Sequence, residues 1–216
     1  EELGIVYLPV EAPTSDFYGG HRLGDNLFSS SLVALDVETG EKIWHQQLIR
    51  HDIWDYDMPS APILVDVDVE GRGPSKLVAV LTKQAWVYVF DRETGEPIWP
   101  MEERPVPPSD VPGERTAATQ LHPTRPAPFD LQGVSEDDLV DFTPEIRAEA
   151  LEILARYRYG PLFTPPSLAE APDGTQGLLL VPGALGAAAW EGGAVDPETG
   201  VLYVGSATTL SVAALA

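Results

Sequence analysis

The feature that most constrains this chain is an internal repeat. Residues 31–44 read SLVALDVETGEKIW and residues 86–99 read WVYVFDRETGEPIW, and matching positions of the two copies stand 55 residues apart. Each copy has an alternating apolar strand, a D-x-E-T-G turn and a short strand ending in tryptophan. In such a turn the aspartate accepts backbone hydrogen bonds and the glycine supplies positive φ. A strand-built repeat of about 50 residues predicts the blades of a β-propeller.

Four strands are expected to form one complete blade within residues 51–102. Their ranges are 61–69, 76–82, 86–91 and 96–102. Residues 1–50 predict an incomplete blade, and residues 181–216 predict the start of another, in which a third turn at 196–200 joins a different strand pair. We therefore expect an all-β chain of about two and a half four-stranded blades. Because propellers protect their strand edges by closing, we interpret the chain as a piece of a larger ring.

The stretch at 103–180 is rich in proline and is expected to be an irregular insertion with one helix. The helix is predicted at about 144–158. Thr143 is its expected N-cap, and Gly160 is expected to end it. An apolar stripe along the helix predicts that it packs on one face of the propeller.

Composition narrows the classes of partner and chemistry. The chain has 34 acidic and 13 basic residues, and its formal charge of −21 argues against nucleic acid as a partner. The absence of cysteine excludes disulfides, cysteine-ligated metals and thiol catalysis within this sequence. No segment has the roughly 18 uninterrupted apolar residues of a membrane span. No signal peptide opens the chain, and we favour an internal segment of a longer protein over one whose export signal was removed.

The densest polar cluster is HDIWDYDMPSAP at 51–62, which contains His51, Asp52, Asp55 and Asp57. In an extended chain Asp55 and Asp57 point to the same side. Two such carboxylates repel one another unless a cation or a shared proton lies between them. The pair could therefore bind a hard metal ion or act as a tuned general base. An acidic loop between blades, with aspartates that cap turns, is the structural alternative.

This cluster resembles the H-D-x-W-D-x-D-x-P-A-x-P segment of the pyrroloquinoline-quinone (PQQ) dependent dehydrogenases, particularly their membrane glucose dehydrogenase-like branch. The segments on either side, from YLPVEAPTSDFYGG to KIWHQQ and from LTKQAWVYVFD to PPSDVPGE, also resemble that family. FTPPS and PGALGAAAWEGGAVDPETGVLYV resemble its later landmarks. Because the resemblance is collinear over nearly all 216 residues, it implies a fragment of an eight-bladed quinoprotein propeller.

The resemblance implies a role for four residues. Asp55 matches the aspartate that abstracts the substrate proton and is also a predicted metal ligand. Asp57 lies where lanthanide-using relatives have an additional metal ligand. Lys83, in LTKQ, matches the basic residue that contacts the quinone oxygens of PQQ, and Trp190 marks the family's cofactor-binding Asn-Trp pair. The alternative for Lys83 is a solvated lysine at a strand end.

Other positions carry weaker expectations. Ala189 replaces the asparagine of the Asn-Trp pair, which puts one cofactor contact in doubt. Glu11 is a weak metal-ligand candidate, and His21 with Arg22 could line the substrate mouth or form an ordinary surface turn. His45 is expected to be structural, and His122 has no visible partner in the sequence.

The resemblance implies an oxidoreductase that uses PQQ with Ca²⁺, Mg²⁺ or a lanthanide. Such an enzyme oxidises a sugar or alcohol and passes electrons to ubiquinone or cytochrome c, in the periplasm, with any membrane attachment through regions missing here. The 216 residues alone are expected to be inactive. Two other classes remain open: a non-catalytic propeller scaffold that binds partners, and a glycoside hydrolase with paired carboxylates.

Overall fold

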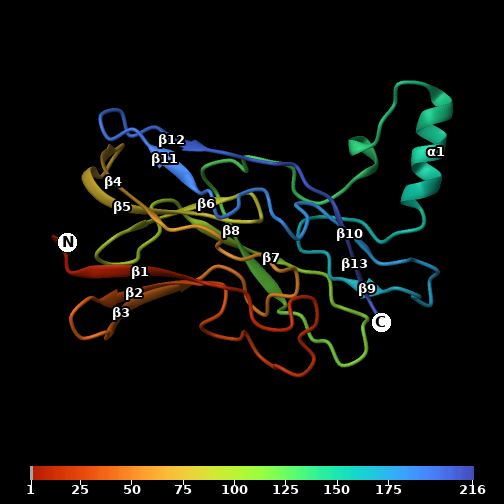
Figure 1. The fold of residues 1–216 in the computed structure, drawn as a ribbon, viewed down its shortest axis with the longest axis horizontal. Coiled ribbons are helices and arrows are strands. Elements are labelled where there is room, and N and C mark those ends of the chain that lie inside the picture. The colour runs from red at the N-terminus through yellow and green to blue at the C-terminus, as the bar shows by residue number, and fades with distance from the viewer. Residues whose placement is uncertain (1) are drawn as a thin grey trace.

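Two three-stranded antiparallel sheets form the N-terminal half of the computed structural model, which describes residues 2–216 (Figure 1). In each sheet the strands pair in chain order. They are β1 (Ile5–Val10), β2 (Ser31–Asp36), β3 (Lys42–Gln47), β4 (Ile63–Val69), β5 (Gly73–Leu81) and β6 (Val87–Asp91). The sequence pattern thus predicted β2 to β6 correctly.

The remaining chain forms smaller elements. Two antiparallel pairs are β7 with β8 and β11 with β12, and a third sheet has the order β10-β13-β9. Their bounds are β7 (Met101–Pro105), β8 (Thr119–Pro123), β9 (Ser167–Leu168), β10 (Leu178–Leu180), β11 (Gly193–Val195), β12 (Leu202–Val204) and β13 (Ser211–Leu215). The stretch at 103–180, predicted to be irregular apart from its helix, therefore also contains the β7–β8 hairpin and two short strands.

The predicted fourth strand of the complete blade, at 96–102, is wrong. Only an isolated bridge between Phe90 and Pro97 continues the sheet beyond β6, and the chain then leaves as β7. Proline has no N–H to donate to a ladder, and Pro97 and Pro100 lie within this segment. Within residues 2–216 the sheets have three strands at most, instead of the four expected in a blade.

The repeated turns have the predicted chemistry. Asp36 Oδ1 accepts hydrogen bonds from the amides of Glu38 and Thr39 at 3.0 and 2.8 Å. In the second copy Gly95 has a φ of +74°, and a Cβ there would lie 2.6 Å from Cδ2 of Trp44. The tryptophan that ends one unit thus packs directly on the turn glycine of the next, which explains why both residues recur in the repeat.

The sheets stack face to face, as Figure 1 shows for β1–β3, β4–β6 and the β11–β12 pair. Trp44 of the first sheet packs near Phe90 of the second, with ring centroids 6.3 Å apart. On the opposite face of the second sheet, buried Leu81 packs with Leu202 of β12. The central strand β5 is therefore buried on both faces, which explains its continuous apolar run LVAVL.

The single α-helix of the described residues, α1 (Pro144–Leu154), begins as predicted but ends early. Thr143 is its N-cap and accepts from the amide of Ile146 at 3.3 Å. The helix stops at Leu154 rather than at Gly160, because the backbone of Arg158 pairs instead with that of Gly177 at 2.8 Å.

The predicted packing of the apolar stripe on the propeller is also wrong. Among the residues of α1, only Leu154 is buried, whereas Ile146 and Ile153 are exposed. The helix projects from one edge of the molecule (Figure 1). Within residues 2–216, no helix combines the length and apolar character needed to cross a bilayer.

Candidate active site

The polar cluster lies on the loop 51–62, which connects β3 to β4 and is not extended. His51 and Asp55 have φ values of +48° and +58°, in the left-handed region that residues other than glycine rarely adopt. The prediction that Asp55 and Asp57 point to the same side assumed an extended backbone, and that assumption is wrong. The loop nevertheless brings the two carboxylates to one place.

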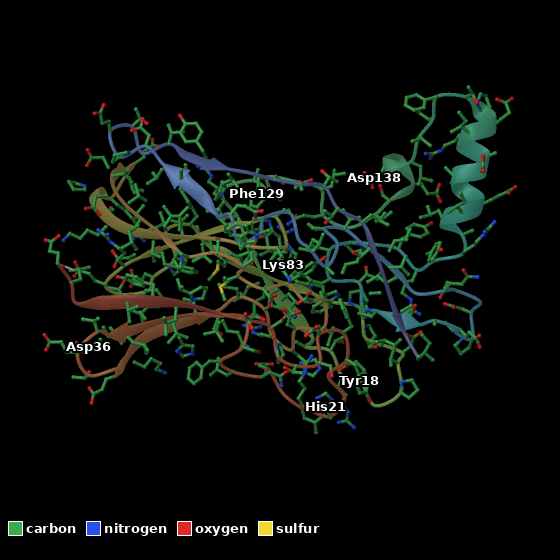
Figure 2. The ribbon with its side chains drawn as sticks, in the orientation of Figure 1. Tyr18, His21, Asp36, Lys83, Phe129 and Asp138 are labelled. Carbon is green, nitrogen blue, oxygen red and sulfur yellow. The ribbon has the colours of Figure 1, made fainter. Side chains whose placement is uncertain are left out.

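Both carboxylates contact the ammonium group of Lys83. Its Nζ lies 3.0 Å from Asp55 Oδ2 and 2.8 Å from Asp57 Oδ2. The side chains of Lys83, Asp55 and Asp57 are 12%, 20% and 19% exposed, so the group is mostly covered but reachable. Figure 2 shows Lys83 near the middle of the molecule. We call Asp55, Asp57 and Lys83 the acidic pair and its lysine.

The surroundings shift the proton affinities of this group. Burial raises the pKa of Asp55 to about 6, although the Lys83 ammonium opposes the shift and the Asp57 charge adds to it. Burial disfavours the charged form of Lys83, but its bonds to Asp57 and Asp55 outweigh burial and raise its pKa. Asp55 is thus a carboxylate of unusually high basicity that lies beside a cation.

The first two residues of the cluster point elsewhere. His51 Nε2 contacts Glu114 Oε1 at 2.7 Å, its Nδ1 lies 2.8 Å from Gly24 O, and both side chains of the His51–Glu114 pair are only 1% exposed. Asp52 is fully buried and accepts from the amide of Trp54 at 2.9 Å. The buried side chains of His51 and Asp52 therefore stabilise the loop and are not accessible to a ligand.

Aromatic residues form the floor under the loop. Trp54 donates from Nε1 to Thr164 O at 2.7 Å, and its ring packs against Phe163 with centroids 5.1 Å apart. Tyr56 donates to Pro182 O at 3.2 Å. The FTPPS segment, more than a hundred residues further along the chain, therefore supports the acidic cluster directly.

The segment around Gly186 passes beside the lysine. The Ala187 amide donates to Lys83 O at 2.9 Å, and a Cβ at Gly186 would lie 2.4 Å from Lys83 Cγ. Trp190, predicted to mark a cofactor contact, is 80% exposed and is not among the side chains that bind Lys83. Ala189 offers only a methyl group where a polar contact was in doubt.

The other candidate residues from the sequence differ in where they lie relative to the loop 51–62. Arg22 donates from Nη2 to Asp52 O at 2.7 Å and so supports the loop, whereas His21 lies on a loop at the molecule's edge, apart from Lys83 (Figure 2). Glu11 has an exposed side chain. His45 packs edge-on against Phe28 with centroids 4.9 Å apart, a structural contact as expected.

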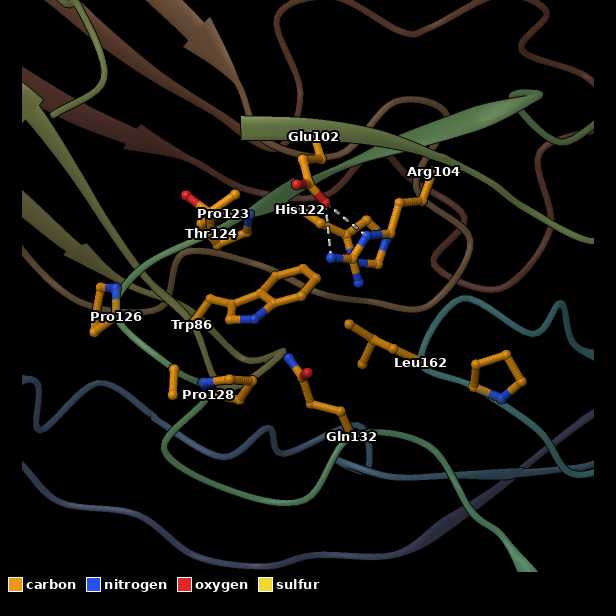
Figure 3. A pocket seen from close by; sticks show the side chains of 12 residues that line it. Trp86, Glu102, Arg104, His122, Pro123, Thr124, Pro126, Pro128, Gln132 and Leu162 are labelled. Carbon is orange, nitrogen blue, oxygen red and sulfur yellow. Dashed lines mark hydrogen bonds and ion pairs between the residues drawn. The ribbon is translucent and has the colours of Figure 1, made fainter. Parts of the chain in front are cut away.

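His122 does have partners, which the sequence did not reveal. It packs edge-on against Trp86, with centroids 4.9 Å apart, and lines a hollow of about 550 Å³ (Figure 3). Burial, together with the Arg104 cation, lowers the pKa of His122 to about 4, so its ring is neutral. Asp55, Asp57 and Lys83 do not line this hollow.

Sequence reasoning missed Glu114 and Gly186. Glu114 is the last residue of PPSDVPGE, a segment that the resemblance covers without assigning this residue a role, and only the fold brings it to His51. Gly186 appeared in the sequence analysis only within the segment PGALGAAAWEGGAVDPETGVLYV, with no role of its own. No local signal marks the first, whereas the positive φ of the second, +77°, explains a glycine there.

The donor set fits a cofactor better than a complete metal site. Within residues 2–216, no group of three or more His, Cys, Asp or Glu side chains gathers as a metal site requires, whereas Ca²⁺ takes 6–8 oxygen ligands. The partly covered Lys83 ammonium can donate to an anionic or carbonyl oxygen. Because Gly186 has no Cβ, the aliphatic part of the Lys83 side chain can pack directly against its backbone.

Comparison with known proteins gives a consistent match. Residues 1–216 match the family model described as PQQ: glucose/ethanol/alcohol dehydrogenase, beta-propeller domain. The chain is 36% identical over 208 residues to the quinoprotein glucose dehydrogenase of Gluconobacter oxydans, covering 93% of this chain and 24% of that protein. It is 31% identical over 204 residues to the quinate/shikimate dehydrogenase (quinone) of Acinetobacter baylyi, covering 94% and 24%. The chain thus spans about a quarter of the length of these relatives.

Solved structures agree in fold. The quinohemoprotein alcohol dehydrogenase ADHIIG from Pseudomonas putida superposes with a TM-score of 0.55 at 26% identity, covering 94% of this chain and 24% of that one. A europium-containing methanol dehydrogenase superposes with a TM-score of 0.56 over 93% of this chain and 27% of that one; at 20% identity it supports the fold alone. The predicted β-propeller class is confirmed.

Proposed function

The chain belongs to the family of PQQ-dependent glucose, ethanol and alcohol dehydrogenases with a β-propeller domain, and on this basis we propose that it supplies the proton acceptor for oxidation of a sugar or alcohol. The single observation that carries the proposal is the acidic pair and its lysine. The carboxylates of Asp55 and Asp57, on the loop 51–62, lie 3.0 and 2.8 Å from the Lys83 ammonium of the turn after β5; all three side chains are mostly covered, and Asp55 has a left-handed backbone. Strained backbone of this kind concentrates at functional sites.

In this proposal Asp55 takes the proton of the substrate hydroxyl. Its Oδ2 binds Lys83, which leaves Oδ1 for the substrate. Asp57 holds the other side of Lys83 and so fixes the ammonium between the two carboxylates. The cation limits the repulsion between the acids and keeps Asp55 ionised, as a general base must be.

PQQ, when bound, supplies the hydride-accepting quinone. Lys83 would donate from Nζ to a cofactor oxygen, and Trp190, with its exposed ring, is a second contact that stays a prediction. Asp55 and Asp57 would offer oxygens to Ca²⁺, Mg²⁺ or a lanthanide, with further ligands from outside this sequence. Ala189 removes one possible polar contact to the cofactor.

The finer properties are also proposals. Relatives named as glucose, quinate/shikimate and glycerol dehydrogenases support a polyhydroxylated sugar or alcohol as substrate. Ubiquinone or cytochrome c would accept the electrons, in the periplasm. Because the chain spans about a quarter of its relatives, the complete dehydrogenase is expected to need further segments, and the 216 residues alone to be inactive.

A non-catalytic propeller scaffold is the alternative. A scaffold gains little from a mostly covered acidic pair around a lysine, since the cost of removing such charges from water can exceed the stability that the ion pairs add. The two functions differ in whether removing the Asp55 carboxylate changes turnover.

The experiment compares Asp55→Asn with Asp68→Asn in the complete dehydrogenase. Asp68 is an exposed aspartate on β4 and serves as a matched control. The protein is loaded with PQQ and Ca²⁺, Mg²⁺ or La³⁺, and dye reduction is measured with glucose, glycerol and ethanol. We expect Asp55→Asn to lower kcat by about 10²–10⁴-fold, the usual contribution of a general base, and Asp68→Asn to leave it unchanged. Wild-type turnover in Asp55→Asn, or no PQQ binding with any of the metals, would refute the proposal.

A further inference from the structure

We infer that Asp52 is a positioning residue that holds Asp55 in its left-handed backbone conformation and so presents the Asp55 carboxylate to Lys83. The inference rests on the proposed function, in which Asp55 is the proton acceptor. It starts from the φ of +58° at Asp55, a left-handed conformation that residues other than glycine adopt infrequently and that surrounding contacts can hold.

The Asp52 carboxylate bonds the backbone on both sides of Asp55. Its Oδ1 accepts from the amide of Trp54 at 2.9 Å, and its Oδ2 accepts from the amide of Tyr56 at 3.2 Å. Residue 55 thus lies between two amides that are bound to the same side chain. The Asp55 side chain accepts instead from Lys83 Nζ, at 3.0 Å.

Asp52 is itself held in place by hydrogen bonds from two other residues. Asp52 is 0% exposed, and Ser30, immediately before β2, donates from Oγ to Asp52 Oδ2 at 2.9 Å. Arg22 donates to the backbone oxygen of Asp52 at 2.7 Å. The carboxylate accepts from Trp54, Tyr56 and Ser30 and so has little freedom to rotate, which lets it determine the conformation of the backbone that it binds.

A general structural role would give a different result from a positioning role. A residue that only stabilises the loop lowers the amount of folded protein, and its effect multiplies with that of any other mutation. A residue that acts through Asp55 affects the step in which Asp55 takes the proton, and its effect disappears once Asp55 has lost its carboxylate.

The test is made in the complete dehydrogenase loaded with PQQ, with Asp52→Asn, Asp55→Asn and the double variant. Asparagine keeps one acceptor oxygen for Trp54 and loses the second for Tyr56. We expect Asp52→Asn to lower kcat by about 10–100-fold while KM changes less than about threefold, as for a group that matters only in the transition state. The double variant is expected to have the same kcat as Asp55→Asn. Asp36→Asn is the matched control, since Asp36 also accepts two backbone amides but at a distant turn.

A crystal structure of Asp52→Asn gives a readout that does not depend on activity. We expect the φ of Asp55 to leave the left-handed region and Oδ2 to move out of hydrogen-bond range of Lys83 Nζ. An unchanged Asp55 in that structure, wild-type kcat, or effects that multiply in the double variant would each overturn the inference. If Asp55→Asn abolishes turnover and Asp52→Asn does not lower it, this inference alone fails. If Asp55→Asn has wild-type turnover, the proposed function fails and this inference with it.

Discussion

Replacing Glu114 by alanine removes one acceptor that serves three donors beneath the acidic loop. Glu114 accepts from the Gly19 amide at 2.5 Å, from His51 Nε2 at 2.7 Å and from the Arg115 amide at 2.8 Å. Burial alone would raise the pKa of Glu114, but the bonds from Gly19 and His51 outweigh it and the pKa is lowered. The residue is therefore a buried, ionised acceptor that joins the proline-rich stretch to the loop that carries Asp55.

The cost follows from the donors left behind. Two of the three, on Gly19 and His51, are buried, and the Glu114 and His51 side chains are each only 1% exposed. A buried donor without a partner costs about 1–3 kcal/mol. With two such donors, Glu114→Ala should therefore lower the free energy of unfolding by about 2–6 kcal/mol.

Urea unfolding followed by circular dichroism measures this loss. With an m-value of about 2 kcal/mol/M, the urea midpoint should fall by about 1–3 M. Glu103→Ala is the matched control: Glu103 also accepts from two side chains, Arg50 and Thr119, but on the surface, where water replaces them. A midpoint in Glu114→Ala no lower than in Glu103→Ala would show that the buried pair does not support the loop.

Three further predictions follow from other contacts. Gly186→Ala should destabilise the protein and lower turnover, because the new Cβ would lie 2.4 Å from Lys83 Cγ; thermal melting and kcat measure both. Trp54→Phe should cost about 1–3 kcal/mol, because Thr164 O loses its buried donor; chemical denaturation measures this. The pKa of His122 is about 4 in the folded protein against 6.5 ordinarily, so only the unfolded chain gains a proton between these values. Stability should therefore fall as pH drops from about 6.5 to 4, less so in His122→Gln, as Tm against pH would record.

Each of these has its own control. Gly174 also has a positive φ, +86°, but open space around it, so Gly174→Ala measures backbone strain without a clash. Equal losses in Gly174→Ala and Gly186→Ala would refute the steric argument. Trp190→Phe, at an exposed indole, should leave stability unchanged, and a loss equal to that of Trp54→Phe would contradict the buried hydrogen bond. Parallel pH curves for the wild type and His122→Gln would remove His122 as the titrating group.

The strands and turns were predictable because their causes are local. Alternation of apolar residues and the D-x-E-T-G chemistry act within a few positions, and β2 to β6 follow from them. The fourth strand was predicted wrongly because the repeat outweighed a local signal: Pro97 and Pro100 cannot donate to a ladder. The early end of α1 was not predictable in this way, because the backbone partner of Arg158 lies on a segment about twenty residues further along the chain.

The residues of the candidate site were likewise named from the sequence, through a resemblance, but not their arrangement. His51, Asp52, Asp55 and Asp57 lie within seven positions, and the sequence alone did not distinguish their roles in the fold. The fold separates them: His51 and Asp52 are buried beneath the loop, whereas Asp55 and Asp57 bind Lys83. Alternation along an extended chain could not predict this, since the left-handed conformation of Asp55 depends on bonds that the folded loop makes.

The amino-acid sequence by itself determined where most strands and turns form and that two units repeat 55 residues apart, whereas the packing of Trp44 on Gly95 is seen only in the structure. Only the tertiary structure decided that Asp55 and Lys83, 28 positions apart, form an ion pair, and that Glu114 lies under their loop. The physical reason is the distance along the chain over which each kind of interaction acts. Hydrogen-bonded turns and apolar alternation are short-range and can be read along the chain, whereas burial and charge pairing depend on which distant segments the packed sheets bring together.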